Sequence, residues 1–156
     1  MLKRLKNILT GTGPVEEPRL ERERIQVATC VILLEMATAD SEFQREERQI
    51  IDRLLREKFA LSSEAAEELM ELADREREAS LDLQQFTREI NDGFSREEKF
   101  EIMETLWRIV YADGVVDKFE DHLVRKLAFL LRLSHREMID CKIRVLEETR
   151  SPSKKS

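Results

Sequence analysis

The feature that most constrains the fold is a long stretch without helix-breaking residues. The chain has 156 residues, and between Arg19 and Ser151 it contains no proline and only two glycines, Gly93 and Gly114. Proline removes a backbone donor and glycine costs backbone entropy, so helices form readily where both are scarce. The same stretch is rich in Glu, Arg, Leu and Ala and contains no β-branched run with the two-residue alternation of a strand. We therefore expect an all-α domain.

Capping signals divide this stretch into separate helices. A hydroxyl or carboxylate three residues before a glutamate satisfies the first free amides of a helix, and the pattern occurs at Ser95–Glu98, Asp117–Glu120 and Ser134–Glu137. Ser62 is a looser N-cap. With the apolar spacing, these signals predict helices at about residues 2–9, 20–38, 44–59, 62–78, 82–92, 95–112, 117–131 and 134–149. The predicted organisation is a mobile basic N-terminal helix and linker (1–19), a helical domain (20–150) and a disordered tail (151–156).

Two of the predicted helices, 20–38 and 95–112, are apolar around most of their circumference. Such helices are buried on all sides, whereas the other helices carry a single apolar stripe. The third helix, for example, carries its stripe at Ile50, Ile51, Leu54 and Leu55. We expect the two apolar helices to lie at the centre of the bundle.

The chain also contains an internal repeat. Residues 33–40 align with residues 106–113, both ending in Ala-Asp, and Glu47 then aligns with Glu120. After a slip of one residue, Leu61-Ser62 aligns with Leu133-Ser134. Each half therefore predicts an apolar helix, an Ala-Asp turn, an amphipathic helix, a Leu-Ser turn and a third helix. Two such three-helix repeats, joined by the linking helix 82–92, predict a bundle with a pseudo-twofold axis.

The two Ala-Asp segments resemble a family pattern. Ala39-Asp-Ser-Glu-Phe-Gln-Arg-Glu-Glu-Arg48 and Ala112-Asp-Gly-Val-Val-Asp-Lys-Phe-Glu-Asp121 resemble the A-D-G-x-[IV]-x-x-x-E motif of TerB-like proteins. That family includes the tellurite resistance protein TerB and is related to the N-terminal domain of the DjlA co-chaperones. The resemblance spans about residues 20–149. In the first copy, Ser41 and Gln44 stand where the motif has glycine and a capping residue.

The resemblance implies a cytoplasmic, all-helical module in a bacterial stress or tellurite resistance context. It also implies an acidic surface, proposed in the family to bind a divalent metal, and no established enzyme activity. The residues that match the motif, together with their neighbours, supply the candidate metal ligands Asp40, Glu47, Asp113, Asp117 and Glu120.

Two interpretations of these carboxylates stay open. Residues at positions i, i+3 and i+4 lie on the same face of a helix, so these candidate carboxylates could converge on one ion. Carboxylate oxygens suit a hard cation such as Ca²⁺ or Mg²⁺, and Zn²⁺ is a third candidate. Their spacing is not that of an EF-hand. The alternative is structural, because Asp117 and Glu120 form a capping box and acids in a first turn complement the helix dipole.

Charge is distributed unevenly along the chain. The formal net charge of −6 argues against a nucleic-acid binder, which normally carries a basic surface. The N-terminus is nevertheless basic and amphipathic through Leu2, Lys3, Arg4, Leu5 and Lys6. These residues are candidates for weak peripheral membrane contact or for docking into a partner. A terminus that is only mobile is the alternative.

No glycine-rich phosphate loop or serine-nucleophile motif is present, and Cys30 and Cys141 stand alone. The sequence therefore predicts a non-catalytic cytoplasmic module that binds a protein partner or a divalent cation through its acidic Ala-Asp loops. A metal-dependent hydrolase is one alternative, although we identify neither a general base nor a substrate pocket for it. A membrane-recruited adaptor using the basic N-terminus is the other.

Overall fold

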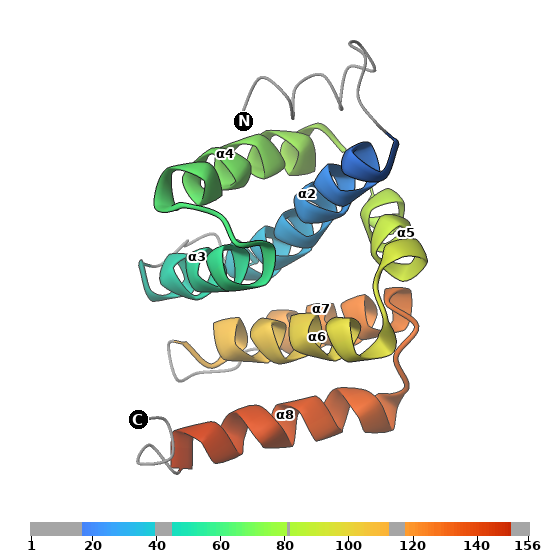
Figure 1. Cartoon of the computed structure of the whole chain (residues 1–156). Coiled ribbons are helices and arrows are strands. Elements are labelled where there is room, and N and C mark those ends of the chain that lie inside the picture. Colours follow the sequence, from blue (N-terminus) through green and yellow to red (C-terminus); the bar gives the residue numbers. More distant parts are fainter. Residues whose placement is uncertain (1–16, 40–44, 81, 113–117, 151–156) are drawn as a thin grey trace.

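The computed structural model describes residues 17–39, 45–80, 82–112 and 118–150. Within them, every regular element is an α-helix: α2 (Glu17–Ala37), α3 (Arg45–Phe59), α4 (Ser63–Ala79), α5 (Gln84–Gly93), α6 (Arg96–Val110), α7 (Lys118–Leu130) and α8 (His135–Arg150) (Figure 1). The expected all-α fold is confirmed. The expected helix at 2–9 and the tail 151–156 lie outside the described residues.

The predicted caps fix several helix starts. Ser62 accepts a hydrogen bond from the Ala65 amide at 3.1 Å at the start of α4. Ser95 and Glu98 form a complete capping box before α6. Before α8, the Ser134 hydroxyl accepts from the Glu137 amide at 3.1 Å and the Ser134 amide donates to the Glu137 carboxylate at 2.8 Å. These bonds satisfy amides that have no partner inside the helix.

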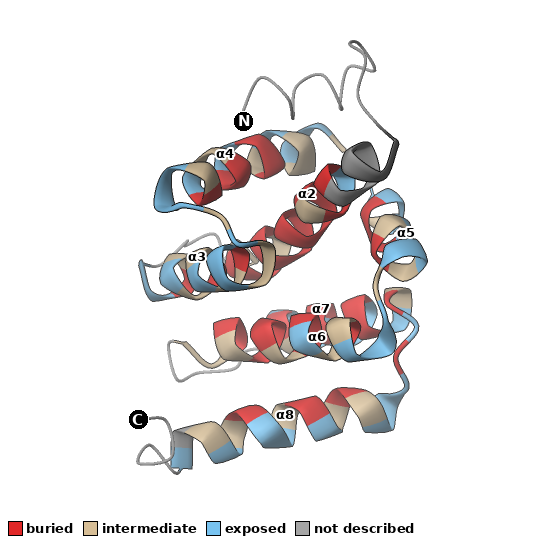
Figure 2. Cartoon of the chain, viewed as in Figure 1, coloured by how far each residue is buried: buried red, intermediate tan, exposed pale blue. Residues whose placement is uncertain are grey.

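Helices α2 and α6 form the centre of the bundle, as predicted. Helix α2 packs against α3, α4, α5, α6 and α7, and α6 packs against α2, α3, α7 and α8. Figure 2 shows buried residues along both helices. Trp107 in α6 is almost completely buried, and its indole nitrogen donates to the Met138 carbonyl oxygen at 3.0 Å. Apolar burial on all sides of these two helices is the main stabilising contribution to the fold.

The two halves pack in the same way. Helices α2, α3 and α4 contact one another, as do α6, α7 and α8, and α5 connects the two groups (Figure 1). Across the halves, α2 contacts α7 and α6 contacts α3. In both contacts, the first helix of one half packs against the second helix of the other half. A pseudo-twofold axis between α2 and α6 produces this arrangement.

The turn between the second and third helices is also repeated. Ala60 and Arg132 have φ angles of 54° and 60°, the only positive values among described non-glycine residues. The residue after each donates its amide to a carbonyl five positions back: Leu61 to Arg56 at 3.2 Å and Leu133 to Ala128 at 2.9 Å. This is the Schellman ending of a helix. Both halves therefore end their second helix in the same way and then begin the third at a serine cap.

Candidate functional site

The carboxylates expected to bind a metal are only partly described. Asp40, Asp113 and Asp117 lie outside the described residues. Glu47 and Glu120 are described, and each is 2% exposed near the start of α3 or α7. Neither carboxylate is without an interaction partner. Burial of a carboxylate is costly unless it is hydrogen-bonded or paired, so these two glutamates belong to the interior of the fold.

No metal-ligand set forms among the described side chains. Nowhere in residues 17–39, 45–80, 82–112 and 118–150 do three His, Cys, Asp or Glu side chains gather at ligand distance. A site centred on Asp40 and Asp113 involves residues beyond these ranges. The metal site therefore stays a prediction.

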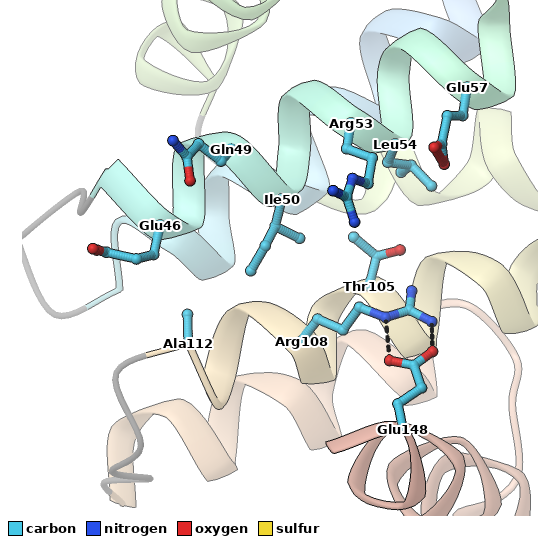
Figure 3. Close-up of a pocket in the computed structure, with 10 residues that line it drawn as sticks. All are labelled: Glu46, Gln49, Ile50, Arg53, Leu54, Glu57, Thr105, Arg108, Ala112 and Glu148. Atoms are coloured by element: carbon cyan, nitrogen blue, oxygen red, sulfur yellow. Dashed lines mark hydrogen bonds and ion pairs between the residues drawn. The ribbon is translucent and has the colours of Figure 1, made fainter. Parts of the chain in front are cut away.

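The described residues instead form a groove between the two repeats. It lies between α3 and α6, is bordered by the end of α8 and has a volume of about 750 Å³ (Figure 3). The lining residues are Glu46, Gln49, Ile50, Arg53, Leu54, Glu57, Thr105, Arg108, Ala112 and Glu148. We call this feature the α3/α6 groove.

The groove has an apolar floor and a charged rim. Ile50, Leu54 and Ala112 are half-buried and supply the apolar surface. Glu46, Arg53 and Glu57 are exposed along α3, and the structure gives none of them an ion pair with another described residue. Arg53 extends into the groove toward Thr105 (Figure 3). Along the rim, the side chains that have no ion pair within the described ranges therefore follow the order Glu46, Arg53 and Glu57, which is acidic, basic and acidic.

An ion-pair network fixes the wall on the α6 side. Arg108 binds Glu148 of α8 through two contacts, Nε–Oε2 at 3.1 Å and Nη2–Oε1 at 2.5 Å. The hydrogen bond to Glu148 is the main reason that the pKa of Arg108 is raised. Glu104 lies 3.7 Å from Arg108 and 3.2 Å from Arg144, and burial raises the pKa of its carboxyl group. The network ties α6 to α8. Arg53 is then the cation of the groove that has no ion pair within the described part of the chain.

The groove ends where the two Ala-Asp segments join the bundle. Glu46 lies in the first turn of α3, directly after segment 40–44, and Ala112 directly precedes segment 113–117. The groove is not visible in the sequence, because the spacing of Ile50 and Leu54 assigns both residues to the core stripe of the helix. Ile51 and Leu55 are completely buried, whereas Ile50 and Leu54 remain partly accessible. The available signal was the width of the apolar stripe on α3, which includes Ile50 and Leu54 in addition to the fully buried Ile51 and Leu55.

The remaining sequence candidates have ordinary structural roles where they are described. Cys30 and Cys141 are buried free cysteines, and burial raises the pKa of both thiols. His122 and His135 are exposed. The N-terminal candidates Leu2, Lys3, Arg4, Leu5 and Lys6 lie outside the described residues. None of the described helices combines the length and the apolar character needed to cross a bilayer.

Comparisons with known proteins identify the fold and the family. The crystal structure of a protein of unknown function from Porphyromonas gingivalis W83 is similar, with a TM-score of 0.56 and 20% sequence identity. The similarity covers 75% of this chain and 86% of that chain, and at this identity it shows the fold alone. No curated protein matches the chain. The family described as tellurite resistance protein TerB matches residues 26–143, which include both Ala-Asp segments and every residue of the α3/α6 groove except Glu148. The chain therefore belongs to the TerB family.

Proposed function

We propose that this TerB-family chain is a non-catalytic binding module whose α3/α6 groove takes a basic amphipathic segment of a partner protein. The observation that carries the proposal is the composition of the groove. Half-buried Ile50 and Leu54 form a strip of accessible apolar surface between two acidic side chains, Glu46 and Glu57, that have no ion-pair partner among the described residues. Apolar anchors in a groove with complementary charges at its rim are the usual basis of helix-in-groove recognition.

The dimensions suit a short helix. Glu46 and Glu57 are eleven positions apart on α3, which corresponds to about 16 Å along a helix axis. A partner helix of three turns spans this length. Its basic residues pair with Glu46 and Glu57, a carboxylate between them reaches Arg53, and its apolar side chains cover Ile50 and Leu54.

The sequence extends the acidic character of one end of the groove. Segments 40–44 and 113–117, which join the bundle beside Glu46 and Ala112, contain Asp40, Asp113 and Asp117. Their negative charge favours a basic partner by long-range attraction. Divalent cation binding by these carboxylates remains a separate proposal.

The side chains of the groove give no reason to assign a reaction. Thr105 is the only hydroxyl-bearing residue of its lining, and its hydroxyl group donates to the Glu101 carbonyl oxygen at 2.8 Å. A hydroxyl group that acts as a nucleophile must donate its proton to a general base, whereas the Thr105 hydroxyl donates to a backbone carbonyl. We therefore propose binding as the function, without a chemical step.

A peptide-binding measurement on the full chain tests the proposal. The probe is a fluorescein-labelled helical peptide of leucine and lysine, with one central glutamate and about 16 residues, or ~24 Å as a helix. We expect saturable binding that weakens about tenfold or more in the double variant E46K/E57K, since two favourable contacts become repulsive.

The matched control is E64K/E71K, which makes the same change in net charge on exposed positions of α4. Equal weakening in both variants would show general charge attraction and overturn the groove assignment. Absence of saturable binding to the unmodified chain would overturn the proposal as well.

A further inference from the structure

The outer face of α7 combines aromatic and cationic side chains. Exposed positions fall on one arc of the helix, about 120° wide at 100° per residue. They are Lys118, Phe119, His122, Arg125, Lys126 and Phe129. We call these six residues the α7 face. None of them is acidic, although the whole chain has a net charge of −6.

Two phenylalanines on this face are unusually accessible. Phe119 is 59% exposed and Phe129 is 78% exposed, and only one other large apolar side chain in the described residues, Ile143 on α8, is comparably exposed. A fully exposed phenylalanine forgoes about 2 kcal/mol of burial free energy. Two on one helix, among charged residues, are typical of a contact surface rather than of scattered surface apolar residues.

The cations on the face are available to a partner. Lys118 and Lys126 make no ion pair with any described residue. Arg125 is paired with Asp121 at 3.0 Å, but both side chains are about half exposed. A positive strip on an acidic molecule attracts negatively charged partners to that side in particular.

A hollow continues the face at the end of α7. It has a volume of about 560 Å³ and lies beside Phe129. Leu130 and Leu133 contribute its apolar surface, and Arg96 and Arg132 its charged surface. Arg96 is engaged with Glu137, whereas the Arg132 side chain has no ion pair among the described residues. The hollow therefore offers an apolar pocket beside an available guanidinium.

We propose that the α7 face and this hollow dock an acidic amphipathic segment of a partner protein. An apolar side chain of that segment enters the hollow beside Phe129, and others cover Phe119. Carboxylates on its flanks pair with Lys118, Lys126 and Arg132. The site is separate from the α3/α6 groove and takes the opposite charge, so it does not depend on the function proposed above.

A protein segment fits these observations better than an anionic membrane does. A lipid surface is flat, so it makes no use of a discrete hollow at one end of the helix. A plane also touches more of the molecule than one helical arc, and the chain as a whole has a net charge of −6, which an anionic surface repels. A single helical segment of a partner protein is narrow enough to contact the α7 face and the hollow without contacting the remaining surface of the molecule.

The test uses the full chain and a fluorescein-labelled helical peptide of leucine and glutamate, about 16 residues long, or ~24 Å as a helix. We expect saturable binding that weakens at least about tenfold in F119A/F129A, because both anchors are removed. I143A, which removes the exposed apolar side chain of α8, should bind normally. Because Phe119 and Phe129 are exposed, the thermal midpoint should remain unchanged in F119A/F129A.

Charge reversal supplies the second comparison. K118E/K126E should abolish binding of the acidic peptide, whereas R75E/R88E, with the same charge change on exposed positions of α4 and α5, should retain it. Equal loss in both variants would overturn the site, as would no saturable binding to the unmodified chain.

Vesicle flotation separates the membrane outcome. Vesicles of phosphatidylcholine and phosphatidylserine are mixed with the unmodified chain and with F119A/F129A. Absence of a phenylalanine-dependent association, together with peptide binding, supports the protein partner. Flotation that requires Phe119 and Phe129, without peptide binding, would overturn the proposal and assign the α7 face to the membrane surface.

Discussion

Ala60 and Arg132 adopt the same left-handed backbone conformation at equivalent positions of the two repeats, with φ angles of 54° and 60°. Ala60 directly follows α3, and Arg132 lies two residues after the end of α7. Each is followed by a leucine and a capping serine. The conformation is retained although neither residue is glycine, which shows that the geometry of this turn is a shared feature of both halves.

The left-handed turn predicts a stabilising substitution. A residue with a β-carbon pays about 1 kcal/mol to adopt this conformation, and glycine does not. Ala60→Gly should therefore increase the free energy of unfolding by up to about 1 kcal/mol, part of which is offset by greater entropy of the unfolded chain. Urea denaturation measures the change. Ala65→Gly, within α4, is the control and should destabilise the protein; equal destabilisation by both would contradict the account.

The capping boxes predict a loss of stability in acid. The backbone hydrogen bond from Ser95 lowers the pKa of Glu98, and that from Ser134 lowers the pKa of Glu137. Because both pKa values are below those of the unfolded chain, the stabilisation is complete above about pH 4.3, the ordinary pKa of glutamate, and disappears as the pH falls through the folded values.

The double variant E98Q/E137Q isolates this effect. It removes two ionisable groups but keeps the shape of the caps, so its urea midpoint should decrease less than that of the unmodified chain between neutral pH and pH 3. Parallel pH dependence in the two proteins would mean that the caps are not the source.

Lys99 is a buried cation that holds the end of α7. Its ammonium group donates to the Leu131 carbonyl oxygen at 2.9 Å and to Asn91 Oδ1 at 3.2 Å, and burial lowers its pKa. Lys99→Met should destabilise the protein by about 2 kcal/mol, since both acceptors lose their donor. Thermal denaturation checks this, with Arg75→Met as the exposed control. A change no larger than that of the control would contradict the assigned role.

Lys99 also predicts a response to alkali. Its folded pKa is lowered, so the charged form is less favourable in the folded protein than in the unfolded chain. The free energy of unfolding should therefore gain a contribution as the pH rises from the folded pKa toward about 10.4, the ordinary pKa of lysine. Lys99→Met should lack this contribution when urea midpoints are compared across the same pH range, and an unchanged alkaline profile would contradict it.

Calorimetry tests the proposed cation site. Titration of Ca²⁺, Mg²⁺ or Zn²⁺ into metal-free protein should give saturable heat that is lost in D40N/D113N, because carboxylate oxygens are the ligands removed. D92N/D140N changes two exposed acids elsewhere and is the control. If neither the unmodified chain nor either variant gives saturable heat, the cation proposal is wrong and the Ala-Asp segments act as helix ends.

Local signals made most of the fold predictable. The serine caps before α4, α6 and α8 depend on residues only three positions apart. The apolar composition of α2 and α6 was sufficient to predict that both helices are buried. The repeat followed from aligned Ala-Asp and Leu-Ser pairs. The left-handed residues Ala60 and Arg132 were not predictable, because no glycine marks either position.

The candidate sites depended on packing between distant segments. The α3/α6 groove forms only because α3 of one half packs against α6 of the other, so Ile50 and Leu54 could not be separated from core residues by spacing alone. Glu47 was predicted to be a metal ligand on an acidic surface, yet its side chain is buried. Its burial depends on how α3 sits in the bundle, which no local pattern encodes.

Chemical-shift mapping on the full ¹⁵N-labelled chain tests the central proposal most directly. On titration with the leucine-lysine peptide, we expect the amide signals of Ile50, Leu54 and Ala112 to shift with a single saturation curve. The amide signals of Phe119 and Phe129 on the α7 face should not shift. Shifts confined to other surfaces, or no saturable shifts at all, would contradict the assignment of the α3/α6 groove as the binding site.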